Sequence, residues 1–216
     1  MKKFWLVLFW LSALGEITAV TVDIAWLHIA SKPVLLLALF GYFFVASKGF
    51  PKWRILVLAS LVFSWAGDVF LMFDSFFLPG LIAFLIAHLF YLFVYVKTGA
   101  NLKRIRIWPL LLLIAYGAAL LLFLFGHLGD LAVPVVVYAL VLLAMAGFAF
   151  QRNGFTSVDS YRLVTIGAML FVLSDSLLAI NQFVSPIPLA SFGVMGTYIG
   201  AQFLIVKGLI HHNNRA

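Results

Sequence analysis

Long apolar segments, separated by short stretches that carry most of the charge, constrain this chain more than any other feature. A bilayer core about 30 Å thick needs about 20 apolar residues per helix. On that criterion the predicted spans are residues 4–22, 33–46, 55–73, 78–96, 107–125, 131–150, 163–182 and 188–210. The sequence therefore predicts an all-α polytopic membrane protein of about eight transmembrane helices. Nothing in it separates two domains, so residues 1–216 are taken as a single integral membrane domain.

The composition excludes several other classes of protein. Hydrophobic residues make up 65% of the chain and charged residues 10%, whereas soluble domains carry about 25% charged residues. The chain has no cysteine, which excludes disulfides, thiolate catalysis and cysteine-ligated metals. The formal net charge is +7, but the basic residues sit in short loops and form no patch, so we expect no nucleic acid partner.

The distribution of lysine and arginine predicts the orientation in the membrane. With the predicted spans, Lys32 is alone among the 14 basic residues on one side. The other side holds Lys2, Lys3, Lys48, Lys52, Arg54, Lys97, Lys103, Arg104, Arg106, Arg152, Arg162, Lys207 and Arg215. Because short cytoplasmic loops are enriched in Lys and Arg, we expect both termini in the cytoplasm and a location in the bacterial cytoplasmic (inner) membrane.

Two features near the N-terminus need interpretation. Lys2 and Lys3, followed by an apolar run that ends near Gly15, fit a cleaved signal peptide loosely. Glu16 favours retention of this helix, because it belongs to the set of polar residues described below. At the second span, Ser31 is a candidate N-cap and Pro33 suits the first turn of a helix, so the helix is predicted to begin there.

The two halves of the chain resemble each other in one short motif. Gly67-Asp68 in the third span and Ser174-Asp175 in the seventh combine a small residue with an aspartate, and each is followed by leucine three positions further on. Both spans run in the same direction through the predicted topology. A parallel repeat of four helices plus four would produce this pattern.

Four ionisable residues lie inside predicted spans: Glu16, Asp68, His88 and Asp175. An ionisable side chain at the centre of a span costs about 2.5–3.5 kcal/mol on insertion scales, so each is a functional candidate. At 1.5 Å per residue, all four lie about 14–21 Å from the inner ends of their spans. We therefore expect them to converge within about 10–12 Å in one polar pocket nearer the outer face.

Buried carboxyl groups without a basic partner suit acid–base chemistry. No lysine or arginine lies at the depth of the three acids, so at least one carboxyl group should hold a proton near neutral pH. A carboxylic acid beside a carboxylate can act as general acid and base. Other interpretations remain open: His88 as a hydrogen bond between helices, Glu16 as the partner of a neighbouring helix, and a zinc site built from His88, Asp68 and Asp175.

Several segments in this order resemble the YhhN-like lysoplasmalogenase family. They are Ser31-Lys32-Pro33, the run from Ser64 through Gly67-Asp68 to Met72, the run from Gly80 to His88 and Tyr91, and Leu173-Ser174-Asp175-Ser176. The resemblance implies an eight-helix membrane fold. It also implies hydrolysis of the vinyl ether of a lysophospholipid, a lysoplasmalogen, to a fatty aldehyde and a glycerophospho-alcohol.

The predicted roles combine this resemblance with the chemistry of the residues. We expect Asp68 and Asp175 to carry the reaction, with His88 and Glu16 assisting, and without cofactor or metal. Helical spacing and position add the candidate substrate-binding residues Lys32, Ser64, Tyr91, Gln182 and Tyr198. The alternative is a proton-coupled transporter that uses the same aspartates as a relay. The membrane lipid is the expected surrounding, and no oligomeric state is predicted.

Overall fold

The computed structural model describes residues 1–101 and 105–213, which form helices and no strand. The long helices are α1 (Lys2–Val22), α2 (Ala25–Ala46), α3 (Trp53–Phe70), α4 (Phe77–Lys97), α5 (Ile107–Phe125), α6 (Ala132–Phe150), α7 (Val158–Phe183) and α8 (Ala190–Asn213). Two short 3-10 helices, η1 (Asp74–Phe76) and η2 (Gly129–Leu131), precede α4 and α6. The eight long helices are each long and apolar enough to cross a membrane, which confirms the predicted fold class.

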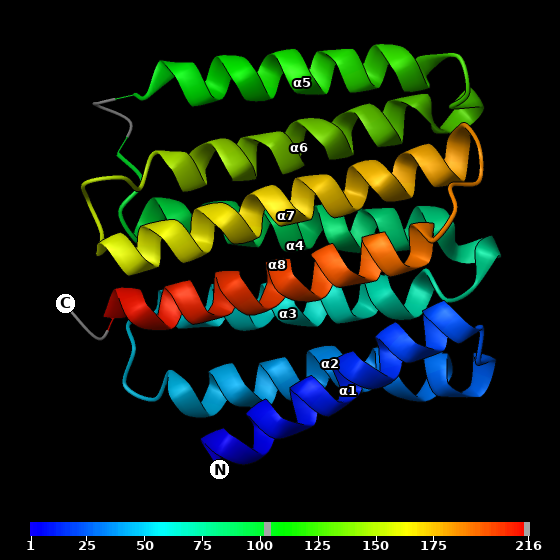
Figure 1. Cartoon of the computed structure of the whole chain (residues 1–216). Helices are drawn as coiled ribbons and strands as arrows, with labels where there is room; N and C mark the ends of the chain where they lie inside the picture. The colour runs from blue at the N-terminus through cyan, green and yellow to red at the C-terminus, as the bar shows by residue number, and fades with distance from the viewer. Residues whose placement is uncertain (102–104, 214–216) are drawn as a thin grey trace.

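The helices form one bundle with nearly parallel axes (Figure 1). Helices α7 and α8 pack against each other, as do α3 and α4, and α1 and α2. Helix α5 lies at one edge of the bundle against α6, and α1 and α2 lie at the opposite edge. Both termini lie at the same end, which we call the terminal end. The connections α1–α2, α3–α4, α5–α6 and α7–α8 lie at the other end, which we call the distal end.

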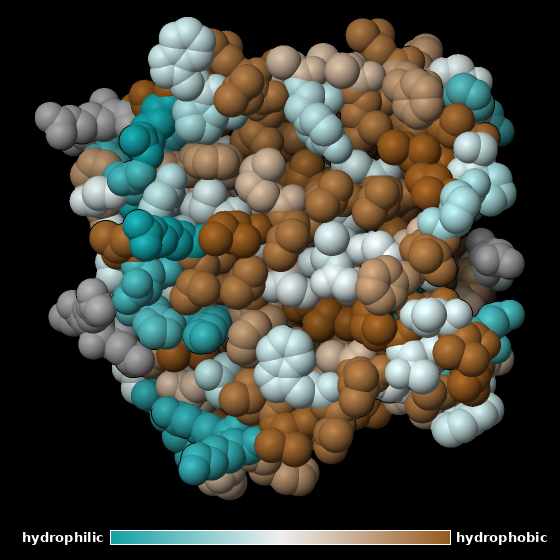
Figure 2. All heavy atoms as spheres, in the orientation of Figure 1, coloured by the Kyte–Doolittle hydropathy of each residue, from teal (hydrophilic) through white to brown (hydrophobic). Residues whose placement is uncertain are grey.

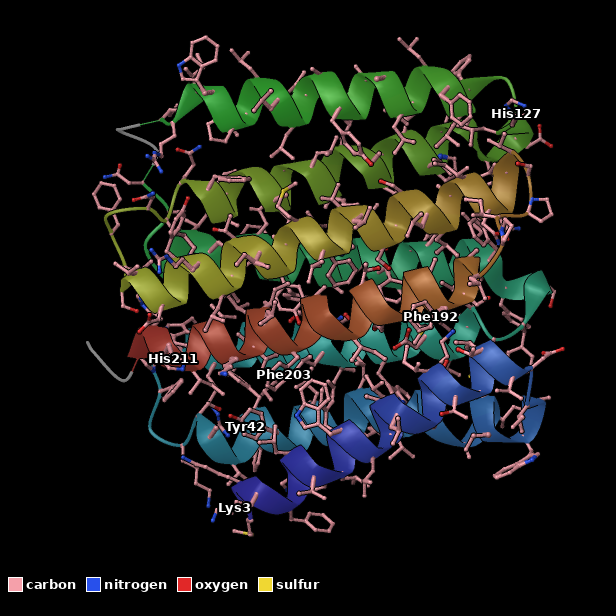
Figure 3. All side chains as sticks on the ribbon, in the orientation of Figure 1. Lys3, Tyr42, His127, Phe192, Phe203 and His211 are labelled. Atoms are coloured by element: carbon pink, nitrogen blue, oxygen red, sulfur yellow. The ribbon has the colours of Figure 1, made fainter. Side chains whose placement is uncertain are left out.

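The outer surface between the two ends is apolar. Large apolar side chains along the helices are exposed, among them Leu112 at 71% and Leu122 at 79% in α5. Figure 2 shows hydrophobic residues over the middle of this face and hydrophilic ones gathered at the terminal end. Figure 3 places Lys3 and His211 at the terminal end and His127 at the distal end. Soluble monomers rarely expose an apolar surface of this extent. Together with the eight long apolar helices, this surface identifies the chain as an integral multi-pass membrane protein.

The basic residues follow the ends of the helices. Lys48, Arg54, Lys97, Arg106 and Arg152 lie in or beside connections at the terminal end, as the predicted topology requires. Three of the basic residues used in the prediction lie outside the described residues: Lys103, Arg104 and Arg215.

The prediction for the second helix was wrong at its start. Helix α2 begins at Ala25, after a link of only two residues from the end of α1, and Pro33 lies inside it. Ser31 is therefore no N-cap; its hydroxyl lies 2.7 Å from the carbonyl oxygen of Leu27 and 2.7 Å from Oε2 of Glu16. Because Ser31 has these partners, its hydroxyl is satisfied within the helix although the sequence Ser31-Lys32-Pro33 predicts a helix start. Lys32 consequently lies within α2 and not in an outer loop at the start of a helix.

Small residues allow close approach at two helix pairs. A Cβ atom on Gly67 of α3 would lie 2.6 Å from the Phe84 ring of α4. One on Gly167 of α7 would lie 2.9 Å from the carbonyl oxygen of Ala201 in α8. Small residues commonly have this role between membrane helices, where backbones pack closely. The first of these contacts adjoins Asp68, so the glycine of the Gly67-Asp68 motif is required by packing.

Candidate active site

A cavity of about 190 Å³ lies in the distal half of the bundle, and α2 to α8 all contribute to its walls. Most of its lining is aliphatic or aromatic, from Leu71 and Phe77 on one side to Leu120 and Leu142 on the other. Its polar lining residues are Lys32, Asp68, Tyr138, Ser174, Asp175, Ser176, Gln182 and Tyr198. A mostly apolar cavity with a few convergent polar groups is typical of a small-molecule site.

Asp68 is buried near the end of α3 and is held by α8. The hydroxyl of Tyr198 donates to Oδ2 of Asp68 at 2.7 Å. Nε2 of Gln202, one turn further along α8, lies 3.4 Å from the same hydroxyl, and the Tyr91 hydroxyl donates to Oε1 of Gln202 at 2.7 Å. The carboxyl group therefore ends a line of hydrogen bonds that connects α3, α8 and α4.

Asp175 lies in the middle of α7, where the hydroxyl of Tyr138 from α6 donates to its Oδ2. The serines on either side of Asp175 fix this part of α7. Ser174 donates to the Val194 carbonyl of α8 at 3.0 Å, and Ser176 accepts from the Tyr116 hydroxyl of α5 at 2.7 Å. Three neighbouring helices thus hold the turn that carries Asp175.

His88 is fully buried but does not line the cavity. Its ring packs edge-on against Phe171, with 4.5 Å between the ring centroids, and against Tyr138, at 5.4 Å. Neither ring nitrogen has a hydrogen-bond partner among the described residues. His88 therefore supports the tyrosine that binds Asp175 and does not itself face the cavity.

Glu16 of α1 is fully buried and contacts α2. Its Oε1 lies 2.9 Å from Nδ1 of His28, and its Oε2 accepts from Ser31 at 2.7 Å. It does not line the cavity, but Lys32, the next residue after Ser31, does. This geometry favours Glu16 as the partner of a neighbouring helix, one of the interpretations open from the sequence.

The cavity gathers only part of the predicted site. Five predicted residues line it: Lys32, Asp68, Asp175, Gln182 and Tyr198. Four lie away from its walls: Glu16, Ser64, His88 and Tyr91. Ser64 is buried one turn before Asp68, and its hydroxyl has no partner among the described residues.

Sequence reasoning missed Tyr138 and the pairing of each aspartate with a tyrosine. The available signal was weak: Tyr138 is the one tyrosine in the otherwise mostly aliphatic predicted span 131–150. A buried tyrosine in such a span usually finds a hydrogen-bond partner, but the sequence does not say which.

The protein is thus a helical membrane bundle with two carboxyl groups on the wall of one mostly apolar cavity. A tyrosine hydroxyl donates a hydrogen bond to each carboxyl group. Among the described residues no three His, Asp or Glu side chains gather closely enough to hold a metal ion. Asp68 and Asp175 both line this cavity.

The chain belongs to the YhhN family, whose model matches residues 27–209. It is 34% identical to Lysoplasmalogenase TMEM86B of Homo sapiens over 174 residues, which is 80% of this chain and 70% of the relative. It is 38% identical to the protein of the same name in Sus scrofa, over 68% of this chain and 59% of the relative. It is 31% identical to the Lysoplasmalogenase of Mycobacterium tuberculosis, over 61% of this chain and 50% of the relative. No solved structure matches the chain.

Proposed function

We propose that this protein hydrolyses the vinyl ether bond of lysoplasmalogens, releasing a fatty aldehyde and a glycerophospho-alcohol. The observation that carries the proposal is the pair Asp68 and Asp175 on one mostly apolar cavity. The names of the relatives, lysoplasmalogenases of mammals and mycobacteria, support the same substrate.

The chemistry of a vinyl ether suits two carboxyl groups. A carboxylic acid donates a proton to the β-carbon, the electrons of the double bond form the new C–H bond, and an oxocarbenium ion results. Water adds to the cationic carbon and loses a proton to a carboxylate. The hemiacetal then collapses to aldehyde and alcohol. An acid, an anion near the cation and a base for the water are all that the reaction requires.

The size of the cavity suits the reacting part of a lipid. Sites for whole drug-sized molecules have about 300–1,000 Å³, more than the 190 Å³ found here. We therefore place the ether bond and its neighbouring carbons inside, and the rest of the alkyl chain outside, past Leu120, Leu121 and Leu124 of the edge helix α5. Lys32 and the exposed Gln182 on the cavity wall would face the phosphate head group.

This placement puts the head group at the distal end of the bundle. We propose that both termini are cytoplasmic and that the protein lies in a bacterial inner membrane, because the basic residues gather at the terminal end. Reporter fusions after Lys48, Lys97 and Arg152 should read as cytoplasmic, and one at Asp130 as external. An external reading after Lys97 would contradict the topology.

The experiment is aldehyde release from a defined lysoplasmalogen by the purified protein in detergent. A proton-coupled carrier would release none, because it changes no bond. Asp68→Asn and Asp175→Asn keep the side-chain shape but remove its proton chemistry, and each should lose at least about a hundredfold in rate. The double variant should lose little more, because residues that act as a unit are not additive.

Two controls make the result interpretable. Asp130→Asn changes an exposed distal aspartate outside the cavity and should leave the rate unchanged. EDTA should also leave it unchanged. Folded Asp68→Asn and Asp175→Asn variants with near wild-type rates would refute the acid–base assignment, and inhibition by EDTA would point to a metal-dependent reaction.

A further inference from the structure

We infer that the two aspartates have different roles: Asp68 is the carboxylate that stabilises the cationic intermediate, and Asp175 is the proton donor. Gln202 and Tyr91 are positioning residues that act through Tyr198. This inference rests on the proposed function, because it assigns the residues their roles in that reaction.

The hydrogen bonds around Asp68 all point toward it. The Tyr91 hydroxyl donates to Gln202, the amide of Gln202 lies as donor toward the Tyr198 hydroxyl, and Tyr198 donates to Oδ2 of Asp68. Donors in a line polarise one another, and a negative charge at the accepting end strengthens every bond in the line. This arrangement stabilises Asp68 as a carboxylate.

Asp175 has different surroundings. The described structure gives its carboxyl group one hydrogen-bond donor, Tyr138. Behind Tyr138 the line stops, because the neighbouring His88 has no hydrogen-bond partner among the described residues and packs against Phe171. As at Asp68, no described cationic side chain hydrogen-bonds to the carboxyl group of Asp175, so the two sites differ in the donors behind the tyrosine. This site favours the neutral acid.

The roles give a balanced cycle. The O–H of Asp175 breaks as its proton passes to the β-carbon, and Asp68 lies beside the oxocarbenium ion that forms. The Asp175 carboxylate then removes a proton from water while the water oxygen bonds to the cationic carbon. Asp175 is protonated again when the hemiacetal has formed, and Asp68 carries its negative charge throughout.

A pair of non-hydrolysable lipids tests the assignment by binding alone. The first is a lysophospholipid analogue with a protonated secondary amine in place of the vinyl ether oxygen, which imitates the cation. The second is the neutral saturated ether of the same length. Binding to purified protein in detergent is measured by calorimetry for the wild type, Asp68→Asn and Asp175→Asn.

We expect Asp68→Asn to bind the ammonium lipid at least tenfold more weakly and Asp175→Asn to bind it within threefold of the wild type. All three proteins should bind the neutral ether alike, which shows that the cavity is intact. A loss of ammonium binding in Asp175→Asn that equals or exceeds the loss in Asp68→Asn overturns the assignment. Absence of aldehyde release by the wild type would instead refute the proposed function.

Gln202→Leu tests the positioning residues, with Tyr91→Phe as the smaller change. If Gln202 acts on the charge of Asp68 through Tyr198, its replacement should weaken binding of the ammonium lipid several-fold and leave binding of the neutral ether unchanged. A purely structural role would weaken binding of both lipids together, and that result would contradict the inference.

Discussion

Gly67→Ala should disturb the site without touching any polar group in it. The added methyl carbon would lie 2.6 and 2.7 Å from two carbons of the Phe84 ring, about 0.8 Å short of ordinary contact at 3.4 Å. Phe84 is buried, lines the cavity, and packs against the ring of Tyr198 with 5.9 Å between centroids. The ring cannot yield freely, so α3 and α4 must separate or Tyr198 must move.

The expected effect has two parts. Overpacking of this kind typically costs about 1–3 kcal/mol of stability, and a displacement of about 1 Å at a catalytic group can cost about a hundredfold in rate. Because Asp68 follows Gly67 directly, we expect a folded variant that has lost most of its aldehyde release. Thermal unfolding in detergent and the aldehyde assay measure the two parts separately.

Two further variants isolate the cause. Gly196→Ala places a methyl group where nothing lies within 4 Å, also within a membrane helix, and should behave as wild type. Adding Phe84→Leu to Gly67→Ala makes room for the methyl group and should restore part of the activity, as expected for residues in contact. Wild-type activity and stability in Gly67→Ala would refute the steric argument.

Three other substitutions test substrate binding by Lys32, packing by His88 and the contribution of Arg152 to the stability of the fold. Lys32→Ala should raise KM for lysoplasmalogen about tenfold and spare kcat, because a phosphate contact away from the bond binds ground and transition states alike; a change confined to kcat would contradict this. His88→Phe should remain folded and lose less than about tenfold in aldehyde release, because the ring packs and does not line the cavity; a hundredfold loss would give it a direct role. Arg152→Ala should lower the free energy of unfolding by at least about 3 kcal/mol, because a fully buried guanidinium donates to Ser160 and to a backbone carbonyl. Unfolding measured beside the exposed control Arg162→Ala checks this, and equal stability of the two variants would be inconsistent with it.

Hydropathy predicted the fold because the thickness of the bilayer sets the length of each apolar span, and a span in lipid must be helical to satisfy its backbone hydrogen bonds. It failed at the start of α2, because the partners of Ser31 come from another helix and from a carbonyl one turn back. Local cap signals carry no information about those contacts.

The acids of the site were also visible in the sequence, because an ionisable residue inside a membrane span is rare and usually functional. Their hydrogen-bond partners were not. Tyr138 and Asp175 are 37 residues apart, and Tyr198 and Asp68 are 130 apart. Which helices pack together decides these pairs, and several packings would satisfy the same hydropathy pattern.

The Glu16 contacts have a consequence for biogenesis. An acidic residue in the middle of a first helix opposes its transfer into lipid, by about 2.5–3.5 kcal/mol on insertion scales if it is charged. The groups that compensate Glu16 are His28 and Ser31 of the very next helix, across a link of two residues. Insertion of α1 and α2 together as a helical hairpin would therefore offset this cost, because Glu16 would enter the lipid with its partners. Replacing Ser31 and His28 would then reduce the amount of protein that reaches the membrane, even if the finished bundle could bear their loss.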